Sequence, residues 1–263
     1  MPTTRPWPTW SERSVWCQSP AERPALHASK GSCRLEDPST AEGATLSEPI
    51  GRLLPWHIRP VTQRLPMDGE PLALHAWVDE RMDVDPVHDR GSYILASVVS
   101  DPDGCGPVRD ALRALLQGRQ RRLHWRDETA PRRTKIAAAI SAMGMTAVVV
   151  VGVPMANRRQ ERARRICMET LLPTLERDYQ VSRVLMEART QNLIRKDREQ
   201  VANLVGKKLI TPALRVGSAR PLEEPILWIP DAVAGAVGAA RLGNPEWLGI
   251  IRHTVTEIEV ALR

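Results

Sequence analysis

The chain has 263 residues, of which 42% are apolar, and it carries a formal charge of +6 at neutral pH. These values allow one sizeable domain with an additional segment, or two small domains, and they exclude a chain that is disordered throughout, a collagen-like fibre and a coiled coil. Four scattered cysteines without a Cys-x-x-Cys pair exclude a disulfide-rich scaffold and argue against a zinc ribbon. The longest apolar run, residues 147–153, is much shorter than the ~20 residues of a membrane span. We therefore expect a cytoplasmic protein with no targeting signal and no membrane contact.

Eleven of the 22 prolines lie between residues 2 and 71. Because proline lacks a backbone donor and restricts the residue before it, no regular element can run far there. We predict a disordered Pro-rich arm over residues 1–70 and a folded domain over residues 71–263. Trp7, Trp10 and Trp16 could anchor this arm to a protein partner. Alternatively, the arm has no structure of its own, and translation could start at Met67.

Two strands open the folded part. Apolar residues on both faces of residues 72–78 predict a buried strand that ends in the carboxylates of Asp79 and Glu80. Residues 93–99 predict a second strand, closed by turn residues 101–104. The order of strand, loop and strand favours an antiparallel pair.

Helices and strands alternate in the rest of the chain. The strands that we expect are 146–153, which is central because it is the most apolar, and 181–188, which ends at Glu187; residues 213–216 and 226–229 are short apolar runs. The helices that we expect are 107–116, 131–143 ended by Gly144, 155–175 kinked or ended by Pro173, 190–205, 232–240 opened by Asp231, and an amphipathic helix from Pro245 through Ile258. This pattern predicts an α/β fold, in which a mixed sheet has helices on both faces.

Three carboxylates occupy the ends of these expected elements, namely Asp79, Glu187 and Asp231. Carboxylates at strand ends converge if their strands are neighbours, and clustered carboxylates repel one another unless a cation joins them. Such oxygen-rich sites suit Mg²⁺ or Mn²⁺, and two such ions can activate water for phosphodiester hydrolysis. Each residue also has an ordinary structural explanation. Asp231 could cap its helix, and Glu187 could pair with Arg189 or another arginine.

Four short segments occur in a fixed order: Trp-Val-Asp-Glu at 77–80, Leu-His-Trp at 123–125, Met-Glu-Ala-Arg at 186–189 and Leu-Trp-Ile-Pro-Asp-Ala-Val-Ala-Gly-Ala at 227–236. Together they resemble the uncharacterised family known as domain of unknown function three-eight-hundred. Members of that family are considered ribonuclease H-like, begin with a strand ending in Asp-Glu-Ser and end with a motif like Leu-Gln-Ile-Ala-Asp-Leu-Val-Ala-Gly-Ala. The resemblance spans roughly residues 74–240. It implies a ribonuclease H-like mixed sheet flanked by helices.

The resemblance also implies roles for single residues. Asp79, Glu187 and Asp231 would be catalytic and would hold Mg²⁺ or Mn²⁺, with Glu80 as a weaker candidate. Arg81 stands where the family has Ser, and it could pair with Asp79 and reduce metal affinity. In the helix after Asp231, two glycines at 235 and 238 would let it approach the sheet closely.

Residues 124–128 form a further dense cluster of polar and aromatic side chains. His124 could shuttle protons or assist product release, and Glu128 could be a further metal ligand. In the alternative interpretation, Trp125 fills a gap in the core, and Asp127 and Glu128 cap the following helix.

Basic residues gather in three groups, at 119–135, at 158–165 (where Arg164 is one of five arginines) and at Lys207-Lys208. Such patches attract phosphate backbones, onto which arginine forks well, although a solvated helix face is the other explanation. The candidates for nucleic-acid binding are Arg121, Arg122, Arg126, Arg132, Arg158, Arg162 and Arg165.

Three functional hypotheses follow from the sequence. The first is a divalent-metal-dependent nuclease acting on RNA or DNA. The second is a catalytically inactive nucleic-acid-binding or adaptor protein on the same fold, which loss of metal affinity through Arg81 would produce. The third is a structural protein that acts through its tryptophan-bearing arm.

Overall fold

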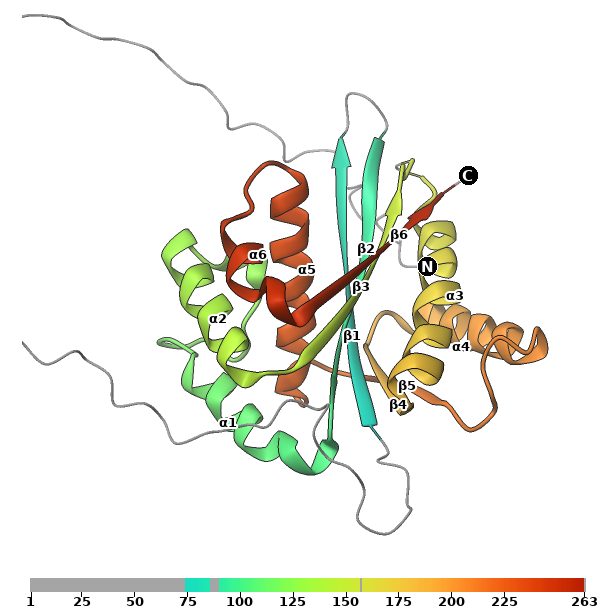
Figure 1. Ribbon diagram of the computed structural model, residues 1–263, viewed down its shortest axis with the longest axis horizontal. Helices are drawn as coiled ribbons and strands as arrows, with labels where there is room; N and C mark the ends of the chain where they lie inside the picture. Colours follow the sequence, from blue (N-terminus) through green and yellow to red (C-terminus); the bar gives the residue numbers. More distant parts are fainter. Residues whose placement is uncertain (1–73, 86–89, 157, 263) are drawn as a thin grey trace, which may run out of the picture. The chain divides into compact units, whose positions relative to one another are not determined.

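The computed structural model describes residues 74–85, 90–156 and 158–262. The predicted Pro-rich arm, its boundary near residue 70 and the alternative start at Met67 lie outside these residues. The described chain forms a six-stranded mixed sheet with helices on both faces (Figure 1). The predicted architecture, an α/β domain in which helices flank a mixed sheet, is confirmed. Among the described residues, no helix is both long and apolar enough to cross a membrane.

The elements follow one another in the alternating order that the sequence predicts. The strands are β1 (Leu74–Asp85), β2 (Arg90–Ser100), β3 (Thr146–Val153), β4 (Val181–Glu187), β5 (Arg215–Ala219) and β6 (Val255–Ala261). The helices are α1 (Cys105–Ala114), α2 (Ala130–Met143), α3 (Gln160–Tyr179), α4 (Gln191–Gly206), α5 (Trp228–Arg241) and α6 (Glu246–Ile251).

The order of strands across the sheet is β5-β4-β1-β2-β3-β6. β1, β2 and β3 form an antiparallel meander, whereas β4 runs parallel to β1, β5 parallel to β4, and β6 parallel to β3. The pairing of β1 with β4 ends where Val78 lies opposite Met186. β1 continues past this point, paired with β2 as far as Asp85. The pairing of β1 with β4 therefore ends directly before Asp79 and Glu187.

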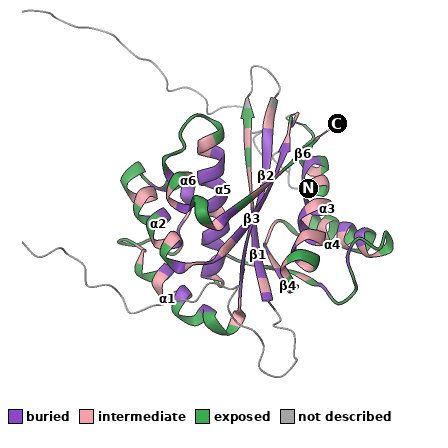
Figure 2. Ribbon diagram, viewed as in Figure 1, coloured by how far each residue is buried: buried purple, intermediate pink, exposed green. Residues whose placement is uncertain are grey.

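Two apolar layers cover the sheet. One layer joins the Trp77 face of β1 to α1, α2, α5 and α6, and the other joins the Val78 face to α3 and α4. Figure 2 shows buried residues along the central strands and along the faces of α5 and α3 that meet them. Since neighbouring side chains on a strand point to opposite faces, Asp79 and Glu80 belong to different layers.

Four expected elements differ from the structure. β1 extends well past Asp79, and α5 begins at Trp228 rather than at Asp231. α3 begins at Gln160 and continues through Pro173, because the leucines on either side of that proline are buried in the core. The expected helix from Pro245 to Ile258 is instead α6 followed by β6. β-Branched residues dominate its second half, and the edge of β3 offers them a pairing partner.

Candidate functional site

Asp79, Glu187 and Asp231 line one cavity of about 280 Å³. Asp79 comes from the middle of β1, Glu187 is the last residue of β4, and Asp231 lies in the first turn of α5. The cavity lies where the pairing of β1 with β4 ends. Beyond this point β1 remains paired with β2, so it continues as one wall of the cavity. Arg122 and His124, on the segment before α2, form part of its lining.

The electrostatics of the cavity are those of crowded carboxylates. Burial and the charges of Glu187 and Asp231 raise the pKa of Asp79 well above its ordinary value. Burial also raises the pKa of Glu187, although a hydrogen bond with Asp79 and the charge of Arg122 oppose this shift. The ionisation of Asp79 and that of Glu187 are therefore linked. Crowded carboxylates of this kind favour a cation that offsets their charge.

Asp231 is fixed by the loop that faces it. Its Oδ2 accepts a hydrogen bond of 2.7 Å from the backbone N–H of Trp125, and His124 Nδ1 lies 3.9 Å from the same oxygen. Burial raises the pKa of Asp231, and these two contacts oppose the shift. Asp231 is not the helix cap that the sequence suggested, because α5 begins three residues earlier. Among the described residues, His124 Nδ1 is buried without a hydrogen-bond partner.

The space beside Gly235 and Gly238 of α5 is occupied by side chains and not by the backbone of the sheet. A Cβ on Gly235 would lie 2.1 Å from a ring carbon of Trp125. A Cβ on Gly238 would lie 2.5 Å from Arg81 Nε and 2.6 Å from an Asp83 carboxylate oxygen. The glycines therefore do not bring the helix and sheet backbones together as expected; Gly235 makes room for the Trp125 indole, and Gly238 for the side chains of Arg81 and Asp83.

Arg81 does not pair with Asp79, contrary to the sequence-based suggestion. Residues 79, 81 and 83 share one face of β1, and the Arg81 guanidinium, although it lines the cavity, pairs with Asp83, with Nη2 2.6 Å from its Oδ1. Glu187 pairs with Arg122 at 3.6 Å rather than with Arg189. The inhibitory pairing expected at Asp79 is therefore absent from the described contacts, and a cation instead faces Glu187.

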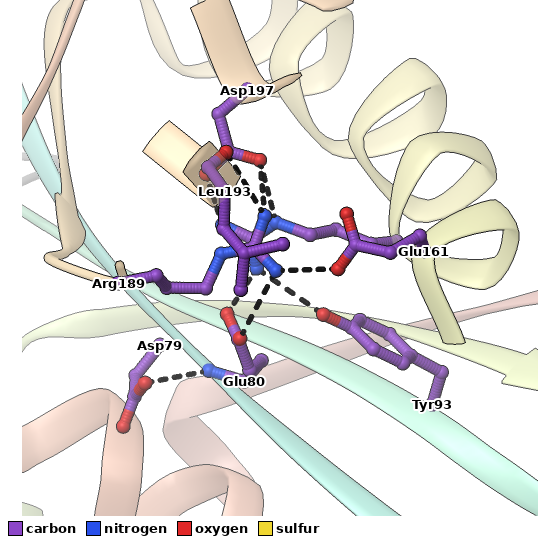
Figure 3. A network of polar contacts seen from close by, with 8 residues as sticks. Asp79, Glu80, Tyr93, Glu161, Arg189, Leu193 and Asp197 are labelled. Atoms are coloured by element: carbon purple, nitrogen blue, oxygen red, sulfur yellow. Dashed lines mark hydrogen bonds and ion pairs between the residues drawn. The ribbon is translucent and has the colours of Figure 1, made fainter. Parts of the chain in front are cut away.

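The carboxylate of Glu80 is engaged on the other face of the sheet (Figure 3). It accepts a hydrogen bond from Arg164, and Arg189 Nη1 lies 3.9 Å from it. Its backbone N–H donates to Asp79 Oδ1 at 2.8 Å. Glu80 thus touches the site through its backbone, and its side chain is committed to the arginines.

Arg164 was missed by sequence reasoning, which grouped it with exposed arginines. Its side chain is 2% exposed and donates to both carboxylate oxygens of Asp197, at 2.9 and 3.0 Å, and to the Tyr93 hydroxyl at 3.2 Å. Arg189 donates to Asp197 at 2.7 Å and to Glu161 at 2.8 Å. A signal was available, because Arg164 stands four residues before the buried Met168 on the stripe that α3 turns to the sheet. This network ties α3 and α4 to the back of the cavity.

The structure does not bring Glu128 to the cavity. Its buried carboxylate accepts hydrogen bonds from Gln120 at 3.0 Å and from Arg132 at 3.2 Å, and Arg132 also donates to the Leu115 carbonyl. Glu128 and Arg132 therefore hold the segment before α2 to α1. Trp125 is buried and packs edge-on against Trp247, as the structural alternative for this cluster suggested. The other half of that alternative is wrong, because Thr129, and not Asp127 or Glu128, stands at the N-cap of α2.

The basic candidates separate into two groups. Arg122 and Arg126 line the cavity, and Arg121 is exposed on the same segment. Arg158, Arg162 and Arg165 are also exposed, but they lie on or next to α3, which covers the opposite face of the sheet from α5 (Figure 1). Only the first group adjoins the acidic cavity.

The donor set suits a divalent metal in its chemistry. Three carboxylates with raised pKa values offer the hard oxygen ligands that Mg²⁺ and Mn²⁺ prefer. Within the described residues, however, no three His, Cys, Asp or Glu side chains are already clustered as metal ligands. The carboxylates repel one another, and two of them already have partners, Asp231 in the Trp125 N–H and Glu187 in Arg122. Cation binding would therefore require these side chains to draw together.

Comparisons with known proteins were made for the chain. No family model matches it, and a search of curated proteins finds no match. Membership of the family that the motifs resemble is therefore not shown. Among solved structures, the chain is similar to ribonuclease HII in its complex with PCNA from Archaeoglobus fulgidus, with a TM-score of 0.38 and 14% identity over 64% of this chain and 73% of that chain. The function proposed below rests on the site's own residues and not on this likeness.

Proposed function

We propose that this protein is a divalent-metal-dependent nuclease that hydrolyses phosphodiester bonds in RNA or DNA. One observation carries the proposal: acids from three separate elements, Asp79, Glu187 and Asp231, line one cavity and all have raised pKa values. Perturbed acids converging in a cleft are typical of functional sites. These three carboxylates would hold Mg²⁺ or Mn²⁺, which supplies an activated water and neutralises charge on the phosphate.

The chain's own residues supply the rest of the site. Asp79 is held by strand pairing and by the Glu80 N–H, so it gives the site a fixed ligand. His124 Nδ1 faces Asp231 and has the free nitrogen needed to hold a proton. Arg126 lies on the exposed rim of the cavity, where a guanidinium can bind the phosphate backbone.

A cleavage assay on the full-length chain tests the proposal. Labelled RNA and DNA oligonucleotides should be cut with Mn²⁺ present and left intact with a chelator. Asp79→Asn should slow cleavage by about 100-fold or more, the scale on which catalytic electrostatic groups act. Asp127→Asn is the matched control, because Asp127 is exposed and does not line the cavity. Equal cleavage by the wild type and Asp79→Asn would show that the assignment is wrong.

A second candidate is a catalytically inactive nucleic-acid-binding or adaptor protein. Two observations favour it: no metal-ligand cluster is preformed among the described residues, and Arg122 faces Glu187. It predicts salt-dependent oligonucleotide binding without Mn²⁺-dependent cleavage. The third hypothesis, a structural role for the arm, concerns residues outside those described, and deletion of residues 1–66 remains its test.

A further inference from the structure

One arginine side chain of the cavity lining forms an ion pair with one of the three acids. The arginines that line it are Arg81, Arg122, Arg126 and Arg189. Arg81 is taken by Asp83, and Arg189 by Glu161 and Asp197. Arg122 is the lining arginine that makes an ion pair, at 3.6 Å, with one of the three acids among the described contacts.

The ion pair between Arg122 and Glu187 is long and partly exposed, so little holds the two side chains together. Its 3.6 Å spacing is an ion-pair contact longer than a hydrogen bond, and the Arg122 side chain is 39% exposed. Arg122 follows a surface turn that begins near Gly118, whose φ of 55° is left-handed. The next residue, Leu123, is buried and anchors the segment. The guanidinium can therefore move into solvent while the backbone stays in place.

We propose that Arg122 is the resting counter-ion of the acidic cavity, which pairs with Glu187 in the cation-free protein and is displaced when a divalent cation binds. This inference rests on the proposed function. A guanidinium beside Glu187 repels a divalent cation that approaches the same carboxylate.

Displacement of Arg122 also couples the metal to nucleic acid. A guanidinium released from Glu187 at the cavity wall is free to fork onto a phosphate. Phosphate that holds Arg122 away from Glu187 in turn removes a competitor of the cation. Because such coupling is reciprocal, each ligand should strengthen the binding of the other.

Mn²⁺ titrations of the full-length chain, followed by the EPR signal of free Mn²⁺, test the counter-ion role. Arg122→Gln should bind Mn²⁺ about threefold to tenfold more tightly than the wild type, because one half-exposed ion pair no longer opposes binding. Arg122→Lys keeps the charge and should stay within about twofold of the wild type. Arg119→Gln, which removes an exposed charge three residues away, controls for the change in net charge.

The outcomes separate this inference from the proposed function. If the wild type binds Mn²⁺ and Asp79→Asn does not, but Arg122→Gln binds no more tightly than Arg119→Gln, the counter-ion role is overturned and the metal site stands. If the wild type itself binds no Mn²⁺ at millimolar concentration, both are overturned. A cleavage-resistant phosphorothioate oligonucleotide should tighten Mn²⁺ binding more in the wild type than in Arg122→Gln. Equal tightening in the two proteins overturns the coupling.

Discussion

Replacing Gly235 of α5 by alanine should test how tightly the helix, the tryptophan loop and the acidic cavity are joined. The added Cβ would lie 2.1 Å from a Trp125 ring carbon, so the ring or the helix must retreat by roughly 1.5 Å to reach ordinary contact. The indole has no free space, because it is 3% exposed, packs against Trp247 with ring centroids 5.5 Å apart, and has Arg133 over its face.

The expected cost combines two opposing effects. Overpacking a filled core costs about 1–3 kcal/mol, and alanine recovers at most about 1 kcal/mol through its better helix propensity. The net destabilisation of Gly235→Ala should therefore be about 1–2 kcal/mol, or about 2–8 °C in Tm for a domain of this size. Movement of Trp125 also withdraws its backbone N–H from Asp231, so Mn²⁺ binding should weaken as well.

Urea and thermal unfolding of the two glycine variants provide the measurement. Gly106→Ala is the matched control, since Gly106 lies in α1 and a Cβ there would meet nothing within 4 Å. It should be neutral or slightly stabilising. If Gly235→Ala unfolds within about 0.5 kcal/mol of Gly106→Ala, Trp125 is not packed as described and the reasoning is refuted.

Two further predictions concern buried charge. The raised pKa of Asp79 means that the folded state holds this proton more tightly than the unfolded state, so in metal-free buffer the unfolding free energy should fall as pH rises from the ordinary Asp value of 3.8 through the folded value. In urea titrations with chelator, Asp79→Asn should reduce this dependence of the unfolding free energy on pH. An unchanged dependence would show that Asp79 does not cause it. Arg164→Met removes the most deeply buried partner of Glu80 and Asp197, leaves them only Arg189, and should cost about 3–5 kcal/mol. Arg195→Met, which breaks an exposed pair, should cost less than about 1 kcal/mol, and equal losses would contradict the buried network.

The sequence predicted elements whose limits are set by local signals. Residues 146–153 form β3 with the expected ends, because an unbroken valine run suits a strand covered on both faces. α2 ends before Gly144, whose φ of 64° is left-handed. The helix expected up to Ile258 failed because its second half is decided by a distant partner. Val255 and Ile258 fit a helical spacing, but they pair with β3, which lies more than a hundred residues earlier in the chain.

The sequence predicted that Asp79, Glu187 and Asp231 would converge, but it did not predict which residues surround them. Asp79 lies in the middle of β1 and not at its end as predicted, but it directly follows the last β1 residue that pairs with the parallel strand β4, which ends at Glu187, so the two acids line the same cavity. The opposite direction of Glu80 follows from strand alternation and could have been foreseen. Which arginine pairs with which acid depends on packing between α3, α4 and the sheet. Arg164 therefore looked like a surface residue although it is almost fully buried.

The three acids differ in how firmly the fold holds them, and this difference orders the events at the site. The backbone of Asp79 is held by its pairing with Ala96 in β2, and its Oδ1 accepts a hydrogen bond from the Glu80 N–H. Asp231 is held by the hydrogen bond from Trp125. Glu187 ends its strand and pairs with Arg122 at 3.6 Å, so it is the acid with the most freedom to move. If the proposed function is right, Glu187 is therefore the acid that would have to leave Arg122 in order to serve as a metal ligand beside Asp79 and Asp231.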